Sequence, residues 1–280
     1  METKSPKEHI VEAEMLSLME EIVSRHTEGD DLPLRLTEAL LNSPELKAMQ
    51  DYANNVSIVR LGLNDHGPVH MKIVCVNALK MLLILNRNGV KTSLEKEKIG
   101  TFADSVSAVL LSSVLHDSGM TIGRKDHELY SGIVSYSFID SLLKQFMTRE
   151  KDTMRRTMIR SLAMEGILGH MGTRLVHSIE AGIVLIADGC DMTKGRARIT
   201  LEIPSKPTEG DIHKYSANSI QKVIISQGKH APIRIDVLMK SEVGLFQVEA
   251  VLIPKIQSSP AKHLVELYAV VEGQDEKRYI

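Results

Sequence analysis

An adjacent histidine and aspartate end an apolar, helix-like run in LSSVLHDSGM, residues 111–120. His116 and Asp117 occupy neighbouring backbone positions, so an imidazole and a carboxylate can reach one metal ion from a rigid support. The dipeptide alone is a weak signal, because most His-Asp pairs are solvated helix ends. Donors of the same types elsewhere in the chain strengthen the hypothesis of a metal centre: His70, His127, His170 and Asp188.

The first of these donors, His70, lies near the start of a predicted helix. The loop LGLNDHGPVH, residues 61–70, leads into MKIVCVNALKMLLIL, whose density of apolar residues predicts a buried helix. His66 lies four residues earlier, but the Gly-Pro pair between the two histidines argues against one continuous helix. We therefore expect His70 to be a metal ligand and His66 to be a loop histidine. Alternatively, His66 could hydrogen-bond a metal ligand or contact the substrate.

Three further predicted helices carry the remaining donors. The run IGTFADSVSAVLLSSVL delivers His116 and Asp117, and the next helix begins at His127. Residues 147–170 are predicted to be helical, with a basic, solvated early part and His170 at the end. The apolar helix over 175–187 ends at Asp188, a carboxylate that needs a partner in such surroundings. Inward-facing residues are expected to include Phe102, Val106, Val109, Leu110 and Val114, then Leu129, Ile133, Tyr136 and Ile139.

The order of these donors resembles the HD superfamily of metal-dependent phosphohydrolases, which are all-helical. His70, then His116-Asp117, then Asp188 in ADGCD carry the resemblance, which covers roughly residues 60–198. His127, in the frame HELYSG, resembles a histidine that follows the HD dipeptide in many members, and His170 resembles a further histidine of binuclear members. If both coordinate, the resemblance implies two metals bridged by Asp117; alternatively, either histidine binds substrate phosphate.

Two departures from the superfamily pattern limit what the resemblance implies. Many members have a lysine directly after HDxG, where this chain has Met120. The subgroup that cleaves cyclic diguanylate has a GYP signature, whereas this chain has GHMGTR. A role for that lysine cannot be carried over, and hydrolysis of cyclic diguanylate is disfavoured.

The chemistry implied by the resemblance is hydrolysis of a phosphomonoester or phosphodiester, with a nucleotide-type substrate, by metal-activated water. One or two divalent ions per chain are expected, and the donor types do not distinguish manganese, iron, magnesium, cobalt, nickel and zinc. Asp117 takes part in catalysis through the metal, and Asp191 is expected either to accept a histidine N–H or to cap the helix turn. The cations expected to meet charge on the phosphoryl group are Arg124, Lys194 and Arg196.

Other functions remain open at this stage. A nucleotide-binding signalling protein of the HD fold would bind its ligand with weak or no turnover. A di-iron oxygenase of the same fold would need all six donors and would consume oxygen. A purely structural helical protein would respond to Asp117→Ala only through its stability, and the donors at helix ends make it the least favoured.

The amino-acid composition is typical of an ordinary soluble protein. The 280 residues are 43% hydrophobic and 25% charged, enough for one large core or for one core with a smaller domain. The formal charge of −2 gives no strong reason to expect nucleic acid or a membrane as partner. Two cysteines exclude a disulfide framework, no secretory signal is evident, and no uninterrupted apolar run approaches about 20 residues. We expect a cytoplasmic protein that binds a small phosphoester or nucleotide and that could form a homo-oligomer.

The expected fold class is mainly α, an HD-domain helical bundle with a small C-terminal α+β domain. The predicted divisions are an N-terminal helical segment at 1–60, the HD metal-binding catalytic domain at 61–198, and an α+β domain at 199–280 that regulates, selects substrate or dimerises. Helices are predicted at 7–26, from a cap at Ser43 to about 60, and at 211–227. Apolar and polar residues alternate over 199–203. Strands are predicted at 233–239, 245–253 and 264–271.

Overall fold

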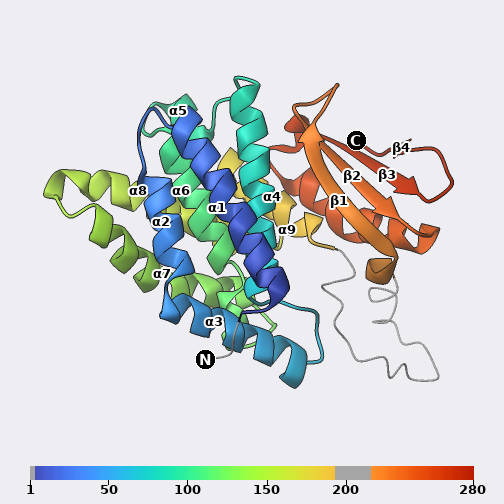
Figure 1. Ribbon diagram of the computed structural model, residues 1–280, viewed down its shortest axis with the longest axis horizontal. Coiled ribbons are helices and arrows are strands. Elements are labelled where there is room, and N and C mark those ends of the chain that lie inside the picture. Colours follow the sequence, from blue (N-terminus) through green and yellow to red (C-terminus); the bar gives the residue numbers. More distant parts are fainter. Residues whose placement is uncertain (1–3, 193–215) are drawn as a thin grey trace.

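The computed structural model describes residues 4–192 and 216–280. Helices build the first part of the chain, and a small four-stranded sheet with its own helices lies beside them (Figure 1). This agrees with the predicted class, mainly α with a small C-terminal α+β part. The predicted cations Lys194 and Arg196, and the alternating segment 199–203, lie outside the described residues.

Helix α6 (Phe102–Leu115) forms the centre of the helical part. Thr101 caps its start by accepting a hydrogen bond from the Asp104 amide at 3.3 Å, and all 14 residues of the helix are buried. The five residues predicted to face inward are therefore buried, and so is the rest of the helix. α4 (Pro68–Arg87), α8 (Thr153–Gly169) and α9 (Ile179–Cys190) pack against α6. A helix surrounded in this way holds its C-terminal residues in a fixed place.

The N-terminal helices cover α4 and α6. α1 (Pro6–His26) packs on α4, and α2 (Leu32–Leu41) packs on α1 and α6. α3 (Pro44–Asn55) begins at the predicted cap, where the Ser43 hydroxyl accepts a hydrogen bond from the Leu46 amide at 3.2 Å. Shorter helical segments are Val56–Arg60 (η1), Ser93–Glu97 (α5), Ser118–Thr121 (η2), Glu150–Asp152 (η3), Glu242–Gly244 (η5) and Lys262–Leu264 (η7).

Helix α7 (His127–Phe146) starts at the predicted residue but turns a different face inward. Ile139 is buried, whereas Leu129, Ile133 and Tyr136 are 40%, 64% and 49% exposed. The prediction for those three residues was wrong because α7 packs through small residues, which allow close approach to η2 and α8. A Cβ added at Gly132 would lie 2.8 Å from a methyl carbon of Leu168.

Helix α4 has the length and composition of a membrane-spanning helix, although no uninterrupted apolar run of that length was expected. Its 20 residues include Lys72 and Lys80, and 78% of its apolar window is buried inside the protein. α4 therefore contributes to the shared hydrophobic core. That core also contains residues of α1, α6 and α9, and of strands β2 and β3.

The C-terminal sheet has the strand order β1-β2-β3-β4. β1 (Ile220–Gln227) pairs antiparallel with β2 (Ile233–Met239), β2 pairs parallel with β3 (Val265–Val271), and β3 pairs antiparallel with β4 (Lys277–Arg278). The predictions for β2 and β3 are confirmed. The helix predicted over 211–227 is wrong for 220–227, which form β1.

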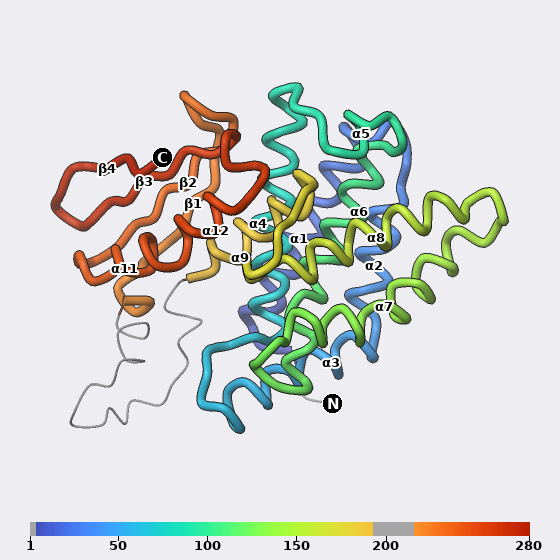
Figure 2. The backbone as a smooth tube through the Cα atoms, turned by 180° about the vertical axis from the view of Figure 1, so that it is seen from behind, coloured from blue at the N-terminus to red at the C-terminus, as the bar shows by residue number. Residues whose placement is uncertain are grey.

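The segment between β2 and β3 is helical, so the strand predicted at 245–253 is wrong. It comprises α11 (Leu245–Gln247), a π-helical turn at Val248–Leu252 (η6) and α12 (Ile253–Ser258). Parallel neighbours need a crossover connection, and here the helical segment supplies it. Val248, Leu252 and Ile256 recur every fourth residue and are fully buried. Figure 2 shows α12 beside α9, so the crossover also touches the helical part.

Candidate metal centre

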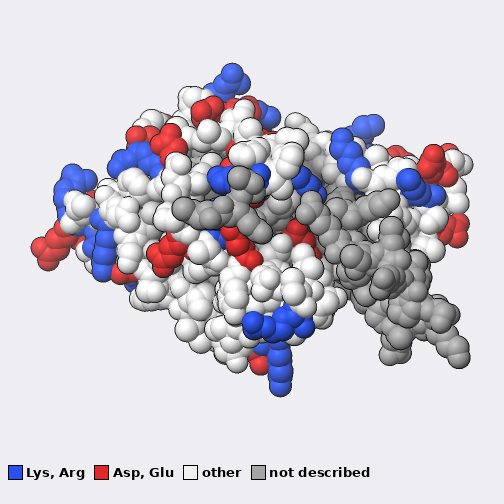
Figure 3. Space-filling view, turned by 60° about the horizontal axis from the view of Figure 1, so that its bottom comes forward, with Lys and Arg blue, Asp and Glu red and all other residues white. Residues whose placement is uncertain are grey.

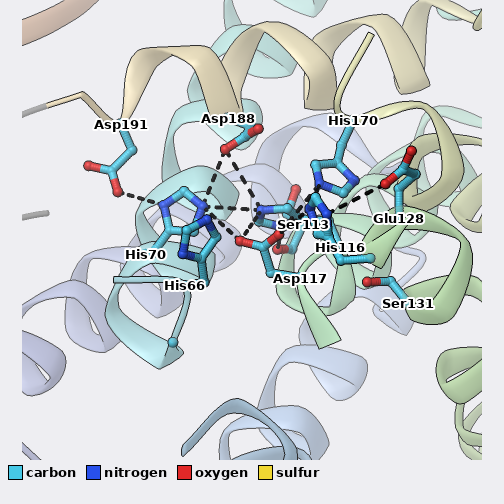
Figure 4. A network of polar contacts seen from close by, with 12 residues as sticks. His66, His70, Ser113, His116, Asp117, Glu128, Ser131, His170, Asp188 and Asp191 are labelled. Atoms are coloured by element: carbon cyan, nitrogen blue, oxygen red, sulfur yellow. Dashed lines mark hydrogen bonds and ion pairs between the residues drawn. The ribbon is translucent and has the colours of Figure 1, made fainter. Parts of the chain in front are cut away.

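The six predicted donors lie together in one buried cluster, five of them labelled in Figure 4. None is more than 5% exposed. α4 supplies one donor near its start, α6 ends in the HD pair, α7 begins with a donor, α8 ends in one and α9 carries the last. The set comprises His70, His116, Asp117, His127, His170 and Asp188. Segments far apart in the sequence thus meet at or next to helix ends.

Hydrogen bonds at Nδ1 fix the orientation of each imidazole. His70 Nδ1 donates to the Asp191 carboxylate at 2.7 Å, which confirms the contact predicted for Asp191. The other acceptors are backbone carbonyls one turn earlier, and a carbonyl can only accept, so Nδ1 carries the hydrogen and Nε2 presents a lone pair. These distances are 2.8 Å from His116 to Ser113, 3.0 Å from His127 to Arg124, and 2.7 Å from His170 to Ile167.

The Nε2 lone pairs face carboxylate oxygens in two groups. In the first group, His70 Nε2 lies 3.2 Å from His116 Nε2, 3.3 Å from Asp117 Oδ2 and 3.2 Å from Asp188 Oδ1. In the second group, Asp117 Oδ1 lies 3.2 Å from His127 Nε2 and 3.4 Å from His170 Nε2. The two histidines of the second group are 3.1 Å apart at Nε2. Asp117 therefore directs one oxygen to each group.

These separations suit a divalent ion. Donors about 2.1 Å from a shared ion are about 3.0 Å apart at an octahedral right angle and about 3.4 Å apart in a tetrahedron. The donors of each group are acceptors with few hydrogens to share, and Asp117 Oδ2 is buried with no hydrogen bond from the described residues. A cation satisfies such a set of lone pairs, so the residues present fit a metal site.

The protonation states favour metal binding as well. Burial lowers the pKa of His170 to about 4, so this imidazole is neutral near pH 7. Burial raises the pKa of Asp117, but the charges of His116 and His66 and the contacts of His116 and His127 with the carboxylate, where these imidazoles are protonated, outweigh it and hold the pKa well below its usual range. A bound cation would displace those protons and take over the same role. The cluster thus offers a neutral imidazole beside an ionised carboxylate, the forms that bind metal.

A cavity of about 790 Å³ opens onto this cluster. Asp117, His170 and Asp188 line its floor, and the predicted cation Arg124 lines its side. The Arg124 guanidinium lies 3.5 Å from His127 Nε2. Over the helical part in Figure 3, Lys and Arg side chains are interspersed with Asp and Glu, and no single sign covers that face. The cationic character is therefore local to the cavity.

Comparison with known proteins gives one substantial match. The chain is 37% identical over 243 residues to a protein named uncharacterized protein MJ1020, from the archaeon Methanocaldococcus jannaschii. The match spans 87% of this chain and 91% of the relative. The chain belongs to the same protein family as MJ1020. The match is longer than the helical part alone, so MJ1020 shares some of the C-terminal part too.

Neither of the other two comparisons adds to this result. No protein-family model matches the chain. No solved structure matches it either.

His66 lies closer to the cluster than the sequence suggested. It is in a loop, as expected, but it is only 6% exposed and lines the cavity, with its ring centroid 6.0 Å from that of His70. Its Nδ1 lies 2.7 Å from the Asn64 carbonyl and 2.8 Å from the Ser57 hydroxyl, and its Nε2 lies 3.4 Å from Arg124. The alternative for His66, contact with substrate, therefore fits its position better than a solvated loop.

Lys255 belongs to the same site and was missed by sequence reasoning. It lies on α12, contacts the Asp188 carboxylate and lines the cavity. The strand predicted at 245–253 ends two residues before Lys255, and nothing local to IPKIQS points to a metal centre on another part of the chain. The helical spacing of the neighbouring apolar residues is the one signal that could have placed Lys255 on a helix.

Proposed function

We propose that the protein is a cytoplasmic, metal-dependent phosphohydrolase of the HD type, which cleaves a phosphomonoester or phosphodiester of a nucleotide-type substrate. The observation that carries the proposal is the division of the Asp117 carboxylate, with Oδ2 in one donor group and Oδ1 in the other. A carboxylate with one oxygen in each of two donor groups is suited to bridge two ions, as in two-metal phosphoesterases.

Each donor group has a separate task in this proposal. His70, His116, Asp117 and Asp188 would hold the first ion, and His127 and His170 would hold the second with Asp117. When bound, divalent ions lower the pKa of a coordinated water and polarise the phosphoryl oxygen. The Nδ1 hydrogen bonds keep the imidazoles oriented, and Asp191 makes His70 a stronger donor.

The cavity supplies the substrate side of the site. Its volume of about 790 Å³ is within the range of small-molecule sites. Arg124 can pair with phosphoryl oxygens as negative charge develops on them. His66 presents Nε2 to the same space, where it can accept a hydrogen bond from a substrate hydroxyl. A cation and a hydrogen-bonding imidazole beside the donor groups suit an anionic ester.

The HD assignment draws support from the placement of the donors on helices. The HD pair ends a buried helix, and Gly119 follows it in a turn where a Cβ would lie 2.1 Å from the His127 carbonyl oxygen. Only a glycine lets the start of α7 approach the turn this closely. The Gly119 amide also donates to the Ser131 hydroxyl at 2.8 Å. The glycine of the HDxG pattern, Gly119, thus allows His127 to approach Asp117.

The test is hydrolysis by wild type and Asp117→Asn, each with manganese, against a chromogenic phosphomonoester, a chromogenic phosphodiester and a nucleotide panel. We expect metal-dependent turnover that falls by about 10²- to 10³-fold in the variant, because neither group keeps its full set of donors. Asp275→Asn, an exposed carboxylate in the C-terminal part, is the matched control. Full activity in Asp117→Asn would exclude the proposed mechanism. Ligand binding without turnover in wild type would favour the signalling alternative.

A di-iron oxygenase is the second candidate, because six donors with a shared carboxylate also suit two iron ions. Oxygen consumption by the iron-loaded protein separates the two functions. A hydrolase keeps its turnover when oxygen is removed, whereas an oxygenase loses it. The cations beside the donors favour the hydrolase.

A further inference from the structure

Lys255 connects the C-terminal part of the chain to both donor groups. Its ammonium contacts Asp188 Oδ2 and donates to the His170 carbonyl oxygen at 2.9 Å. The Lys255 side chain is 11% exposed and that of Asp188 is 6% exposed, so this pair lies largely out of water. One residue of α12 therefore holds a side chain of the first group and the backbone of a residue in the second.

The two oxygens of Asp188 have different neighbours. Oδ1 lies 3.2 Å from His70 Nε2 and 3.8 Å from His116 Nε2, and Oδ2 contacts Lys255. A carboxylate can turn about its last bond, which exchanges the oxygens or presents both to an ion. Exchange of the two equivalent oxygens leaves the arrangement unchanged. An ammonium on one oxygen disfavours presenting both oxygens to an ion, because the ion pair would be lost in buried surroundings.

Glycines on α9 make room for this arrangement. A Cβ at Gly189 would lie 3.1 Å from Lys255 Cδ and 3.1 Å from a methyl carbon of Leu252. Two turns earlier on α9, a Cβ at Gly182 would lie 2.5 Å from the Ser259 hydroxyl. Both glycines therefore face the segment that carries Lys255. The aliphatic stem of Lys255 lies against α9 where that helix has no side chain in the way.

We propose that Lys255 is a positioning residue of the metal centre, which holds Asp188 with Oδ1 toward the first donor group. The C-terminal part is then a component of the centre and not only a neighbour of it. The inference rests on the metal centre of the proposed function. A positioning role means that replacing Lys255 changes the affinity for metal. Replacing a residue that only contacts substrate would leave that affinity unchanged.

The experiment is calorimetric titration of metal-stripped protein with manganese. Lys255→Met removes the ammonium while keeping most of the apolar stem, and Lys255→Gln removes the charge while keeping an N–H donor on a side chain one atom shorter. We expect one of the two manganese affinities to fall by about 10- to 100-fold in both variants, the size typical for partners of metal ligands. Lys262→Met, an exposed lysine of the same part of the chain, should bind as wild type does.

Thermal unfolding without metal identifies any variant that fails to fold. If Lys255→Met fails, Lys255→Gln provides the measurement, since it keeps a polar donor beside the buried Asp188 carboxylate. Unchanged manganese affinities in a folded variant would overturn the inference, and a raised KM in that variant would reassign Lys255 to substrate binding. If wild type binds manganese but hydrolyses no phosphoester, the proposed function fails while the inference stands. If wild type binds no ion, both are overturned.

Discussion

Replacing His127 with alanine should halve the thermal stabilisation that metal ions give the protein. The variant leaves the second donor group with only His170 Nε2 and Asp117 Oδ1, which are 3.4 Å apart. The first group keeps its four donors, because His127 has no part in it. The second ion should be lost and the first retained.

The size of the effect follows from linkage between binding and folding. An ion at a free concentration about 1,000 times its Kd stabilises the folded state by about 4 kcal/mol. For a chain of 280 residues, an unfolding entropy of about 2 cal/mol/K per residue gives about 0.6 kcal/mol per degree. Each ion should therefore raise Tm by about 7 °C, so wild type should gain about 14 °C and His127→Ala about 7 °C.

The assay is thermal unfolding, followed by circular dichroism, in chelator and then in excess manganese. His177→Ala is the matched control, because His177 is an exposed histidine of the same helical part. Elemental analysis of the same samples should give two ions per chain in wild type and one in His127→Ala. A full shift in His127→Ala would show that His127 is not a ligand, and the absence of any shift in wild type would refute the metal centre itself.

Two further predictions concern the turn after the HD pair and the N-terminal helix. A Cβ at Gly119 would lie 2.1 Å from the His127 carbonyl oxygen. Gly119→Ala should therefore lower the free energy of unfolding by about 1–3 kcal/mol, measured by denaturant unfolding. The same variant should bind one ion fewer per chain, measured by elemental analysis. Burial raises the pKa of Glu12, but hydrogen bonds and charges from Lys4 and Lys72 outweigh it, so the pKa lies below its usual 4.5. The stability that Glu12 contributes is complete above pH 4.5 and is lost as the pH falls through the lowered pKa, and denaturant unfolding of Glu12→Gln should show a smaller loss over that range.

Matched controls exist on the same elements. Gly123→Ala adds its Cβ where no atom lies within 4 Å, so it should retain both ions and the stability of wild type. Glu20→Gln changes an exposed carboxylate of α1 and should leave the acid dependence as it is in wild type. Two ions in Gly119→Ala, or an unaltered acid profile in Glu12→Gln, would contradict the respective argument.

Local signals predicted much of the helical part. Ser43 and Pro44 mark the start of α3, and Pro68 starts α4 two residues before His70. Such caps act within a few residues of the chain, so the sequence alone reveals them. The six donor residues were chosen for their resemblance to the order in the HD superfamily, and the structure brings them together at or near helix ends. Their role as metal ligands stays a prediction.

Tertiary packing determines the features that were predicted wrongly from the sequence. Leu129, Ile133 and Tyr136 have helical spacing, but α7 approaches η2 through Gly119 and the small residues of its other face. The run at 245–253 is apolar enough for a strand, and it is helical because the parallel pairing of β2 and β3 requires a crossover. Neither constraint is local to the segment that it controls.

The same crossover explains why the part of the site that the C-terminal region contributes could not be predicted from the sequence. Lys255 reaches the cluster because α12 follows from the order of strands in the sheet, and α12 meets α9 because Gly182 and Gly189 permit close contact. The cavity is correspondingly lined from both sides, by His66 and Arg124 of the helical part and by residues of 247–258. A ligand that fills this cavity would contact the C-terminal part as well as the donor groups, so its binding would be thermodynamically linked to the packing of the two parts.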